Sequence, residues 1–176
     1  TSIVAADIDG GSNDACGIAS LASAQYDFSC AHVGVNVITL TVTDVNGNSS
    51  TCDAEVTVLD TIAPTAICQA VTTQLDANGN GSITAEQIDF GSGDACGLQP
   101  LAVAPSTFTC ANVGPNIVTL TVTDLNGNSS TCLGTVNVQD NVQPIAICKD
   151  ITVYLDATGN VSFTGADVDN GSNDAC

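Results

Sequence analysis

The feature that most constrains this chain is the regular spacing of its cysteines. Four of them recur eighty positions later and the last one continues the series: Cys16, Cys30, Cys52 and Cys68, then Cys96, Cys110, Cys132 and Cys148, then Cys176. The surrounding sequence repeats with them, because residues 1–60 and 81–140 align without a gap at 36 identical positions in 60. Self-similarity at a fixed period is the signature of tandem structural units. We therefore expect an array of copies of one fold.

Prolines indicate where one copy ends and the next begins. Pro64 and Pro144 each follow an acidic connector, LDTIAP and QDNVQP, and proline interrupts a strand. We predict the C-terminal part of one repeat over residues 1–60, a complete repeat over residues 61–140 and the N-terminal part of a third over residues 141–176. We therefore expect these 176 residues to be part of a longer array of repeats.

Within the repeat, hydrophobic residues alternate with polar ones, as they do in half-buried strands. Ile38, Leu40 and Val42 alternate with threonines, and the alternation returns over residues 52–59 after an Asn-Gly turn. The pattern predicts an antiparallel hairpin. Four further short segments are suitable for strands. The segment ITAEQID could form at most one turn of helix. We therefore expect an all-β fold of tandem immunoglobulin-like antiparallel β-sandwich modules, arranged as an extended array.

The charge of the chain excludes two classes of partner. The sequence has 19 acidic residues, a single Lys and a net charge of −18. Nucleic acids and anionic membranes need Lys and Arg to neutralise phosphates, so neither is an expected partner. No apolar run approaches the length of a membrane span, so we expect no direct membrane insertion. The expected partners are neighbouring repeats of the same chain, other copies in a fibre, and a surface or glycan receptor.

Nine cysteines in 176 residues indicate an oxidising compartment. We therefore expect a protein that is secreted, extracellular or exposed on a cell surface. Structural zinc is the competing use of many cysteines, but the sequence has no C-x-x-C pair and one histidine, His32. Disulfides are the favoured interpretation.

The repeat resembles a known family. The motifs PTAICQ, GDACG, TDLNGNSSTC and TVNVQD, in that order, resemble the HYR-like (hyalin repeat) immunoglobulin-like tandem repeats of Bacteroidota cell-surface proteins, including SprB-type gliding adhesins. The resemblance covers the whole 80-residue unit. It implies a role in cell adhesion, as one module of a long extracellular array.

Sequence alone allows three pairings of the four cysteines in a repeat. In an immunoglobulin-like sandwich, the first strand begins at the end of the module where the last hairpin turns, so we predict a bond from Cys68 to Cys132. The remaining cysteines give three further expectations: Cys96 bonded to Cys110, Cys16 bonded to Cys30, and partners outside these residues for Cys52, Cys148 and Cys176. The alternative pairs, Cys52–Cys68 and Cys132–Cys148, would have to span most of a module.

Acidic and amide residues gather in repeated turns. Residues 76–81 have the D-x-N-x-N-G start of an EF-hand calcium loop, but the twelfth position is Gln87, with Asp167 and Asp7 as its equivalents. A tight hairpin turn is the alternative, because Asp, Asn and Gly favour left-handed backbone conformations. The sequence leaves both interpretations open.

Clustered carboxylates repel one another unless a cation intervenes, and oxygen-rich sites suit Ca²⁺. We predict Ca²⁺ at loops or junctions of the array. The candidate ligands are Asp60, Asp76, Asn78, Asn80, Asp89, Asp94, Asp124, Asn126, Asp140, Asp169 and Asp174. The alternative is a solvated acidic surface. Thr61 follows Asp60 in a motif that resembles the Asp-Thr-aliphatic O-glycosylation signal of Bacteroidota.

The sequence favours a structural function over an enzymatic one. His32 is replaced by Asn112 eighty positions later, and no Ser-His-Asp set or phosphate-binding loop is recognisable. We expect a structural stalk or fibre segment of an extracellular bacterial surface adhesin, stiffened by calcium. The first alternative is a self-assembling extracellular filament subunit with strand exchange between chains. A carbohydrate-binding array is the second, disfavoured because aromatic residues are few.

Overall fold

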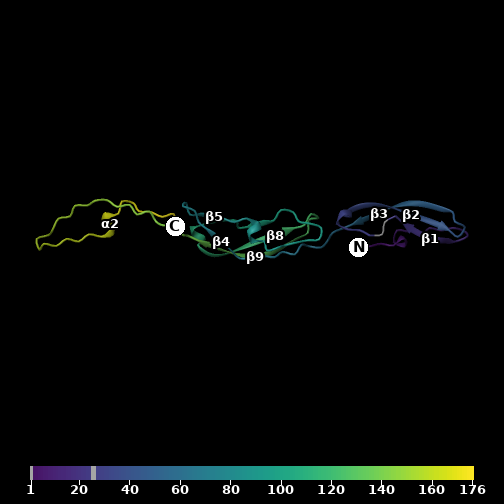
Figure 1. The fold of residues 1–176 in the computed structure, drawn as a ribbon, viewed down its shortest axis with the longest axis horizontal. Helices are drawn as coiled ribbons and strands as arrows, with labels where there is room; N and C mark the ends of the chain where they lie inside the picture. The colour runs from purple at the N-terminus through teal and green to yellow at the C-terminus, as the bar shows by residue number, and fades with distance from the viewer. Residues whose placement is uncertain (1, 25–26) are drawn as a thin grey trace. The chain divides into compact units, whose positions relative to one another are not determined.

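The computed structural model describes residues 2–24 and 27–176, and it is built mainly of β-strands (Figure 1). The expected all-β class is therefore confirmed. The chain forms two compact units, which are described one at a time. Unit 1 contains Thr1–Ala63, Asp94–Gly97 and Asp124–Asn128, and unit 2 contains Pro64–Gly93, Leu98–Thr123 and Ser129–Cys176. The boundaries of the sequence repeat at residues 60 and 140 stay a prediction.

Unit 1 contains one antiparallel sheet in the order β1-β2-β3 (Ile18–Ser23, Gly34–Asp44 and Ser49–Val58). The hairpin of β2 and β3 is the one that alternation predicts, with Leu40 opposite Cys52. Short 3₁₀ turns η1 (Ala5–Asp7) and η2 (Cys30–His32) flank the sheet. Ile38 and Leu40 of β2 are buried, as is Phe28. Among the described residues, β3 is an edge strand, because no strand pairs with its outer side.

Unit 2 is a sandwich of a four-stranded and a two-stranded sheet. The larger has the order β4-β9-β8-β6 (Val71–Gln74, Ser129–Gln139, Gly114–Thr123 and Ala102–Ala104), and the smaller pairs β5 (Asn80–Ser82) with β7 (Thr107–Thr109). Helix α1 (Ala85–Ile88) and the 3₁₀ turn η3 (Cys110–Asn112) connect strands. The pairing of β4 with β9 is parallel, whereas the other pairs are antiparallel.

The core of unit 2 lies between these layers. The inward residues of β8 and β9 are at most 1% exposed, because other side chains of the core pack against that face of the sheet: Val118, Leu120, Val122, Val136 and Val138. Leu75, Ile83, Ile88 and Phe108 complete the same core cluster. Gly134 in β9 lets α1 approach closely, since a Cβ there would lie 2.8 Å from Ile88 Cγ2.

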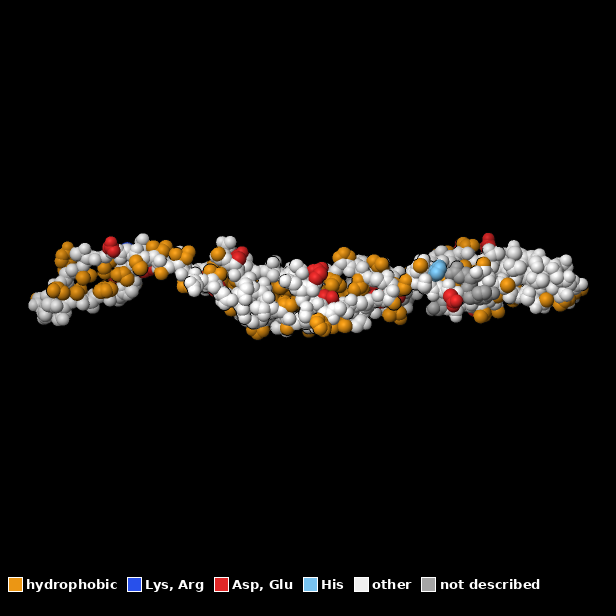
Figure 2. All heavy atoms as spheres, in the orientation of Figure 1, with side chains coloured by type: hydrophobic (Ala, Val, Ile, Leu, Met, Phe, Trp, Pro, Cys, Tyr) orange, Lys and Arg blue, Asp and Glu red, His pale blue; other side chains and the backbone are white. Residues whose placement is uncertain are grey.

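Residues 141–176 belong to unit 2 and repeat its opening segment. The bridges Thr65–Gly93 and Cys68–Asp89 recur eighty positions later as Ile145–Asn173 and Cys148–Asp169, and α2 (Gly165–Val168) recurs in the place of α1. Unlike β4, residues 151–154 pair with no strand in the described part of the chain. Residues 151–167 are exposed throughout, and Figure 2 shows their hydrophobic side chains at the surface. No helix of the described residues has the length and apolarity of a membrane span.

Candidate functional site

The structure contains three disulfides. Cys68 is bonded to Cys132, the predicted pair, and the other two bonds are Cys30–Cys96 and Cys110–Cys176. The predicted bonds Cys16–Cys30 and Cys96–Cys110 are therefore wrong, and so is the expectation that Cys176 pairs outside these residues. Three cysteines are free and exposed: Cys16, Cys52 and Cys148. The alternative pairs Cys52–Cys68 and Cys132–Cys148 are also not formed.

The error in the pairing has a physical cause. The prediction assumed that each bond closes within one repeat, so that the loop before Cys96 would fold back on Cys110. In unit 1 that loop instead meets Cys30 at the start of η2, with a Cα–Cα distance of 5.1 Å. The same contact recurs eighty positions later as Cys110–Cys176, at 5.2 Å. The three loops overlap in sequence, so every position from Cys30 to Cys176 lies inside at least one disulfide loop.

In the acidic turns, the carboxylates accept hydrogen bonds from backbone N–H groups of the same turn. In each turn, one oxygen of the first Asp accepts the N–H groups two and four residues later at 2.8–3.0 Å; the four turns begin at Asp44, Asp76, Asp124 and Asp156. The glycine of the turn at Asp76, Gly79, has a φ of +74°, which L-residues rarely adopt. The residues Asp76, Asn78 and Asn80 thus lie in a tight turn that joins β4 to β5, two strands of different sheets, and calcium binding there stays a prediction.

The twelfth position of that loop also has a structural use. The Gln87 side chain accepts the Thr84 N–H at 2.8 Å at the start of α1. Asp167 and Asp7 make the same contact with the N–H groups of Thr164 and Val4. Such capping satisfies an N–H group that the first turn of a helix leaves unpaired.

Asp124 is the charged side chain that is most fully enclosed, with 0% exposure. Its carboxylate accepts the N–H of Asn126 at 2.9 Å and the side-chain amide of Asn128 at 2.7 Å. Burial alone raises the pKa of Asp124, but these hydrogen bonds outweigh it and hold the pKa below its ordinary value of 3.8. Asp124 therefore stays ionised and fixes the shape of its turn.

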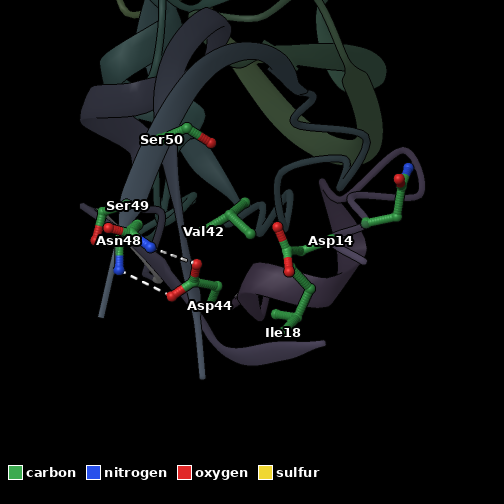
Figure 3. Close-up of a pocket in the computed structure, with 8 residues that line it drawn as sticks. Asp14, Ile18, Val42, Asp44, Asn48, Ser49 and Ser50 are labelled. Atoms are coloured by element: carbon green, nitrogen blue, oxygen red, sulfur yellow. Dashed lines mark hydrogen bonds between the residues drawn. The ribbon is translucent and has the colours of Figure 1, made fainter. Parts of the chain in front are cut away.

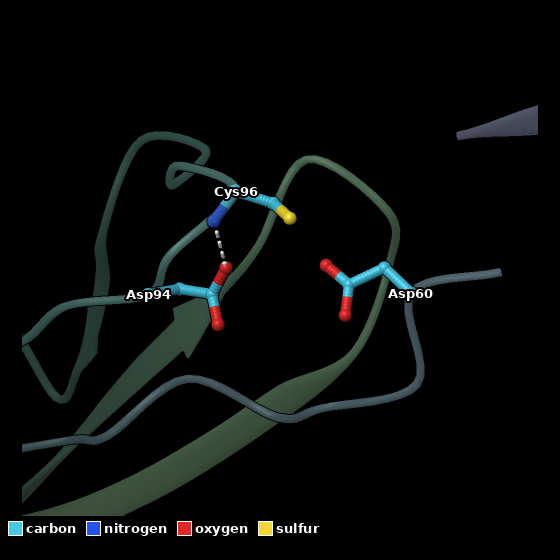
Figure 4. Close-up of side chains that lie close together, drawn as sticks. All are labelled: Asp60, Asp94 and Cys96. Carbon is cyan, nitrogen blue, oxygen red and sulfur yellow. Dashed lines mark hydrogen bonds between the residues drawn. The ribbon is translucent and has the colours of Figure 1, made fainter. Parts of the chain in front are cut away.

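Two predicted ligands do come together in unit 1. Asp60 and Asp94 form a group with Cys96 in which the three ligand atoms lie within 4.8 Å of one another (Figure 4). One Asp60 oxygen, Oδ1, accepts the Ile62 N–H at 3.1 Å, whereas Oδ2 is buried and has no hydrogen-bond partner. Asp94 accepts the Cys96 N–H at 2.7 Å. A buried carboxylate oxygen without a donor requires an explanation.

The chemistry of this group favours a hard cation. Cys96 is bonded to Cys30, so its sulfur is not a thiolate and the available donors are oxygens. The sequence of unit 1 contains no Lys or Arg, since the single Lys of the chain is Lys149. No lysine or arginine of this unit can therefore neutralise Asp60 and Asp94. Carboxylate oxygens of this kind suit Ca²⁺ rather than transition metals.

The remaining predicted ligands are used in local turns. Asp89 and Asp169 each accept two N–H groups of the residues that follow them, and Asp140 and Asp174 accept one each. In the described part of the chain, Asp140 and Asp174 form no group like that of Asp60 and Asp94. Asn128, which sequence reasoning missed, donates its side-chain amide to the Asp60 carbonyl at 3.1 Å. Thr61 is exposed, and its glycosylation stays a prediction.

Comparisons with known proteins are sparse. Neither a protein-family model nor a curated protein matches this chain. Among solved structures, the chain is similar to protocadherin gammaB7 EC3-6 in a cis-dimer structure, with 21% sequence identity and a TM-score of 0.31. The match covers 69% of this chain and 35% of that one, so the chain spans about a third of that structure. At this TM-score the likeness assigns neither family nor function, and the hyalin-repeat resemblance stays a prediction.

Proposed function

We propose that this chain is a segment of an extracellular bacterial surface adhesin, in which disulfide-bonded immunoglobulin-like repeats form a structural stalk. The observation that carries the proposal is the overlap of the three disulfide loops, which leaves no position between Cys30 and Cys176 outside a covalent loop. Three disulfides fit an extracellular or secreted protein, because reducing compartments keep thiols free. A connected series of small domains fits a stalk that spaces other parts of a surface protein.

Calcium is the second part of this proposal. Asp60 Oδ2 and the Asp94 carboxylate would hold Ca²⁺, which would neutralise two carboxylates in a unit that contains no Lys or Arg. Because Asp60 is the second residue of the connector LDTIAP, a bound ion would fix the beginning of that connector against the loop of Asp94. The role of the ion would be to limit local opening and proteolysis of the connector.

The experiment compares thermal unfolding and connector proteolysis in Ca²⁺ and in chelator. We expect saturating Ca²⁺ to raise the melting temperature and to slow cleavage between Asp60 and Pro64, because a ligand that binds the folded state stabilises it by about 2.7 kcal/mol at a hundredfold excess over Kd. The variant Asp60→Asn should lose most of this response. Its matched control is Asp140→Asn, which changes the equivalent residue outside the cluster. Identical melting and cleavage of the unchanged protein in both solutions would remove calcium from the proposal.

A self-assembling filament subunit with strand exchange between chains is the second candidate function. Electron microscopy of the native product distinguishes the two candidates. A stalk gives threads one chain thick, and a filament gives fibres that contain many chains.

A further inference from the structure

The outer face of the large sheet of unit 2 carries no charge. Its four strands, β4, β6, β8 and β9, contain no Asp, Glu, Lys, Arg or His, although the chain has 19 acidic residues. Alternate residues of β8 and β9 belong to the core, so the residues between them point outward. Those near the middle of the sheet are threonine or aliphatic: Ile117, Thr119, Thr121, Thr131, Leu133 and Thr135. We call this surface the neutral face.

Two large apolar side chains lie near the middle of the neutral face. Ile117 is 60% exposed and Leu133 is 70% exposed. Ile117 lies opposite Thr135, whereas Leu133 lies opposite Thr119, which in turn lies opposite Ala104 of β6. Ile117 and Leu133 are therefore diagonal neighbours on the two central strands, about 7–8 Å apart. Covering this apolar group with a second surface would remove it from water.

Unit 1 has a hairpin that can be compared with this sheet position by position. Residues eighty positions apart are counterparts here, so β2 and β3 correspond to β8 and β9. The two hairpins have the same antiparallel register. Their turns also agree, because Asp44 accepts the N–H and the side-chain amide of Asn48 at 2.8 Å (Figure 3), as Asp124 does with Asn128 at 2.7–2.8 Å. The two outer faces therefore differ in their side chains rather than in their backbone.

The difference between the two faces is a difference in charge. Asp53 and Glu55 of β3 stand where β9 has Leu133 and Thr135. The Thr39 hydroxyl of β2 donates to the Asp53 carboxylate at 2.7 Å, so this carboxylate lies on the outer face of unit 1. The hairpin thus accommodates acidic residues at these two positions, and the neutral face lacks them.

The charge of the chain favours one kind of partner for the neutral face. A partner rich in Lys and Arg would be attracted to the acidic surfaces rather than to a face without carboxylates. A second copy of this chain has the same net charge of −18, and acidic surfaces repel it. Contact between two neutral faces brings no carboxylate of one strand against another. The same face can meet itself across a twofold axis, as in most protein dimers.

The area of the neutral face is suitable for a weak contact. From the lengths of the four strands, a rise of about 3.4 Å per residue and a strand spacing of about 4.8 Å, the face covers about 450 Å². Two copies would bury about 900 Å², which is at the low end for specific interfaces. Several such contacts along two proposed stalks would add up. Only this last gain rests on the proposed function.

We propose that the neutral face of unit 2 binds the neutral face of a second copy of this chain, sheet against sheet. The two sheets lie about 10 Å apart, as two packed sheets do. Ile117 and Leu133 leave water at the contact, and threonine methyl groups pack around them. The threonine hydroxyls bond to hydroxyls of the other copy or to water. This pairing joins chains side by side, and it needs neither calcium nor an exchange of strands.

Sedimentation velocity at concentrations up to about 1 mM tests the pairing. The protein carries Cys16→Ser, Cys52→Ser and Cys148→Ser, so that no free thiol can link two copies. We expect concentration-dependent dimers. We also expect the dissociation constant to fall as NaCl is added, because salt screens the repulsion between two acidic chains. A monomer at every concentration overturns the proposal, and so does a dimer that salt dissociates.

Two variants of this protein locate the contact. Leu133→Asp with Thr135→Glu places the acidic residues of β3 on the neutral face, so the fold should be kept and the dimer should weaken at least tenfold. The control adds the same two charges near α1, as Gln87→Glu with Phe90→Asp. Both of these residues are exposed, and α1 lies on the inner side of the sheet because its Ile88 belongs to the core. The control should form dimers like the parent protein.

Thermal melting checks that both variants are folded. Dimers that persist in the variant Leu133→Asp, Thr135→Glu overturn the proposal, and so does an equal loss of dimers in the control. The response of melting to Ca²⁺ and chelator is measured separately. Failure of the pairing would therefore leave the proposed stalk unaffected, and absence of a calcium response would leave the pairing unaffected.

Discussion

At the scale of single residues, Gly79 shows how a turn and a disulfide depend on one another. Its φ of +74° suits glycine, and a Cβ there would lie 2.6 Å from Cys110 Sγ. The bond Cys110–Cys176 therefore packs directly on the backbone of the turn. Gly159, its counterpart, has a similar φ of +80° but no heavy atom within 4 Å of the corresponding Cβ position.

This pair separates backbone strain from steric overlap. We expect Gly79→Ala to lower the free energy of unfolding of unit 2 by about 2–4 kcal/mol, because strain in φ and overlap with the disulfide act together. Gly159→Ala should cost less, about 1–2 kcal/mol, from strain alone. Urea unfolding with the disulfides intact measures both. Equal effects in the two variants would show that the disulfide does not restrict the turn.

Asp124 predicts a pH dependence whose sign follows from its hydrogen bonds. Its pKa in the folded state is lower than the ordinary 3.8 of the unfolded chain, so near that pH the unfolded state binds more protons. The stability that ionised Asp124 contributes is complete above pH 3.8 and is lost as the pH falls through the folded pKa.

Asp124→Asn should therefore be less stable than the unchanged protein at neutral pH, because the new amide faces the amide of Asn128. The difference in the free energy of unfolding between the two proteins should become smaller as the pH falls below 3.8. Denaturant unfolding from pH 7 to pH 2 measures it, with the exposed Asp150→Asn as control. A difference that stays constant across this range would rule out the carboxylate as its source.

At the scale of elements, sequence patterns predicted the structures that contacts between nearby residues determine. The hairpin of β2 and β3 could be read from alternating side chains, since the period of two fixes which face of a strand is buried. One-turn helices and acidic turns were also predictable, because their capping contacts span a few residues. The fold class followed from these elements.

The elements that sequence reasoning missed depend on distant residues. The partner of Cys30 could not be found from spacing, because it lies sixty-six positions away, beyond a connector and another sheet. The parallel pairing of β4 follows from the same kind of contact, since Cys68 precedes β4 and bonds to Cys132 near the beginning of β9. Of the predicted calcium ligands, Asp60 and Asp94 meet because the loop of Asp94 lies beside Asp60 in unit 1, although 34 positions separate them in the sequence.

At the scale of the whole molecule, disulfides shorten the covalent path through the chain. A path from Cys30 to Cys176 passes through one S–S bond to Cys96, along residues 97–109, and through a second S–S bond from Cys110. The strands β2, β3, β4, β5, β8 and β9 all lie outside that path. The fully extended length between the Cα atoms of Cys30 and Cys176 is about 60 Å by this route, the two disulfides included.

Single-molecule pulling measures this path. We expect the oxidised protein to show no release of the segments between Cys30 and Cys96 or between Cys110 and Cys176. After reduction, each segment should add about 200 Å of contour length, given its separation of 66 residues. Two such extensions in the oxidised protein would mean that these bonds do not carry the load. The variant Cys110→Ser, Cys176→Ser should restore one extension and leave the other hidden.

Under tension, the continuous covalent route would determine what limits the proposed stalk. Its breaking strength would be set by sulfur chemistry and by peptide bonds, and only slightly by how firmly the sheets are held together. Unfolding of a sandwich would then leave the tether almost as long as before. Reduction of the disulfides, rather than a higher force, would make the proposed stalk extensible.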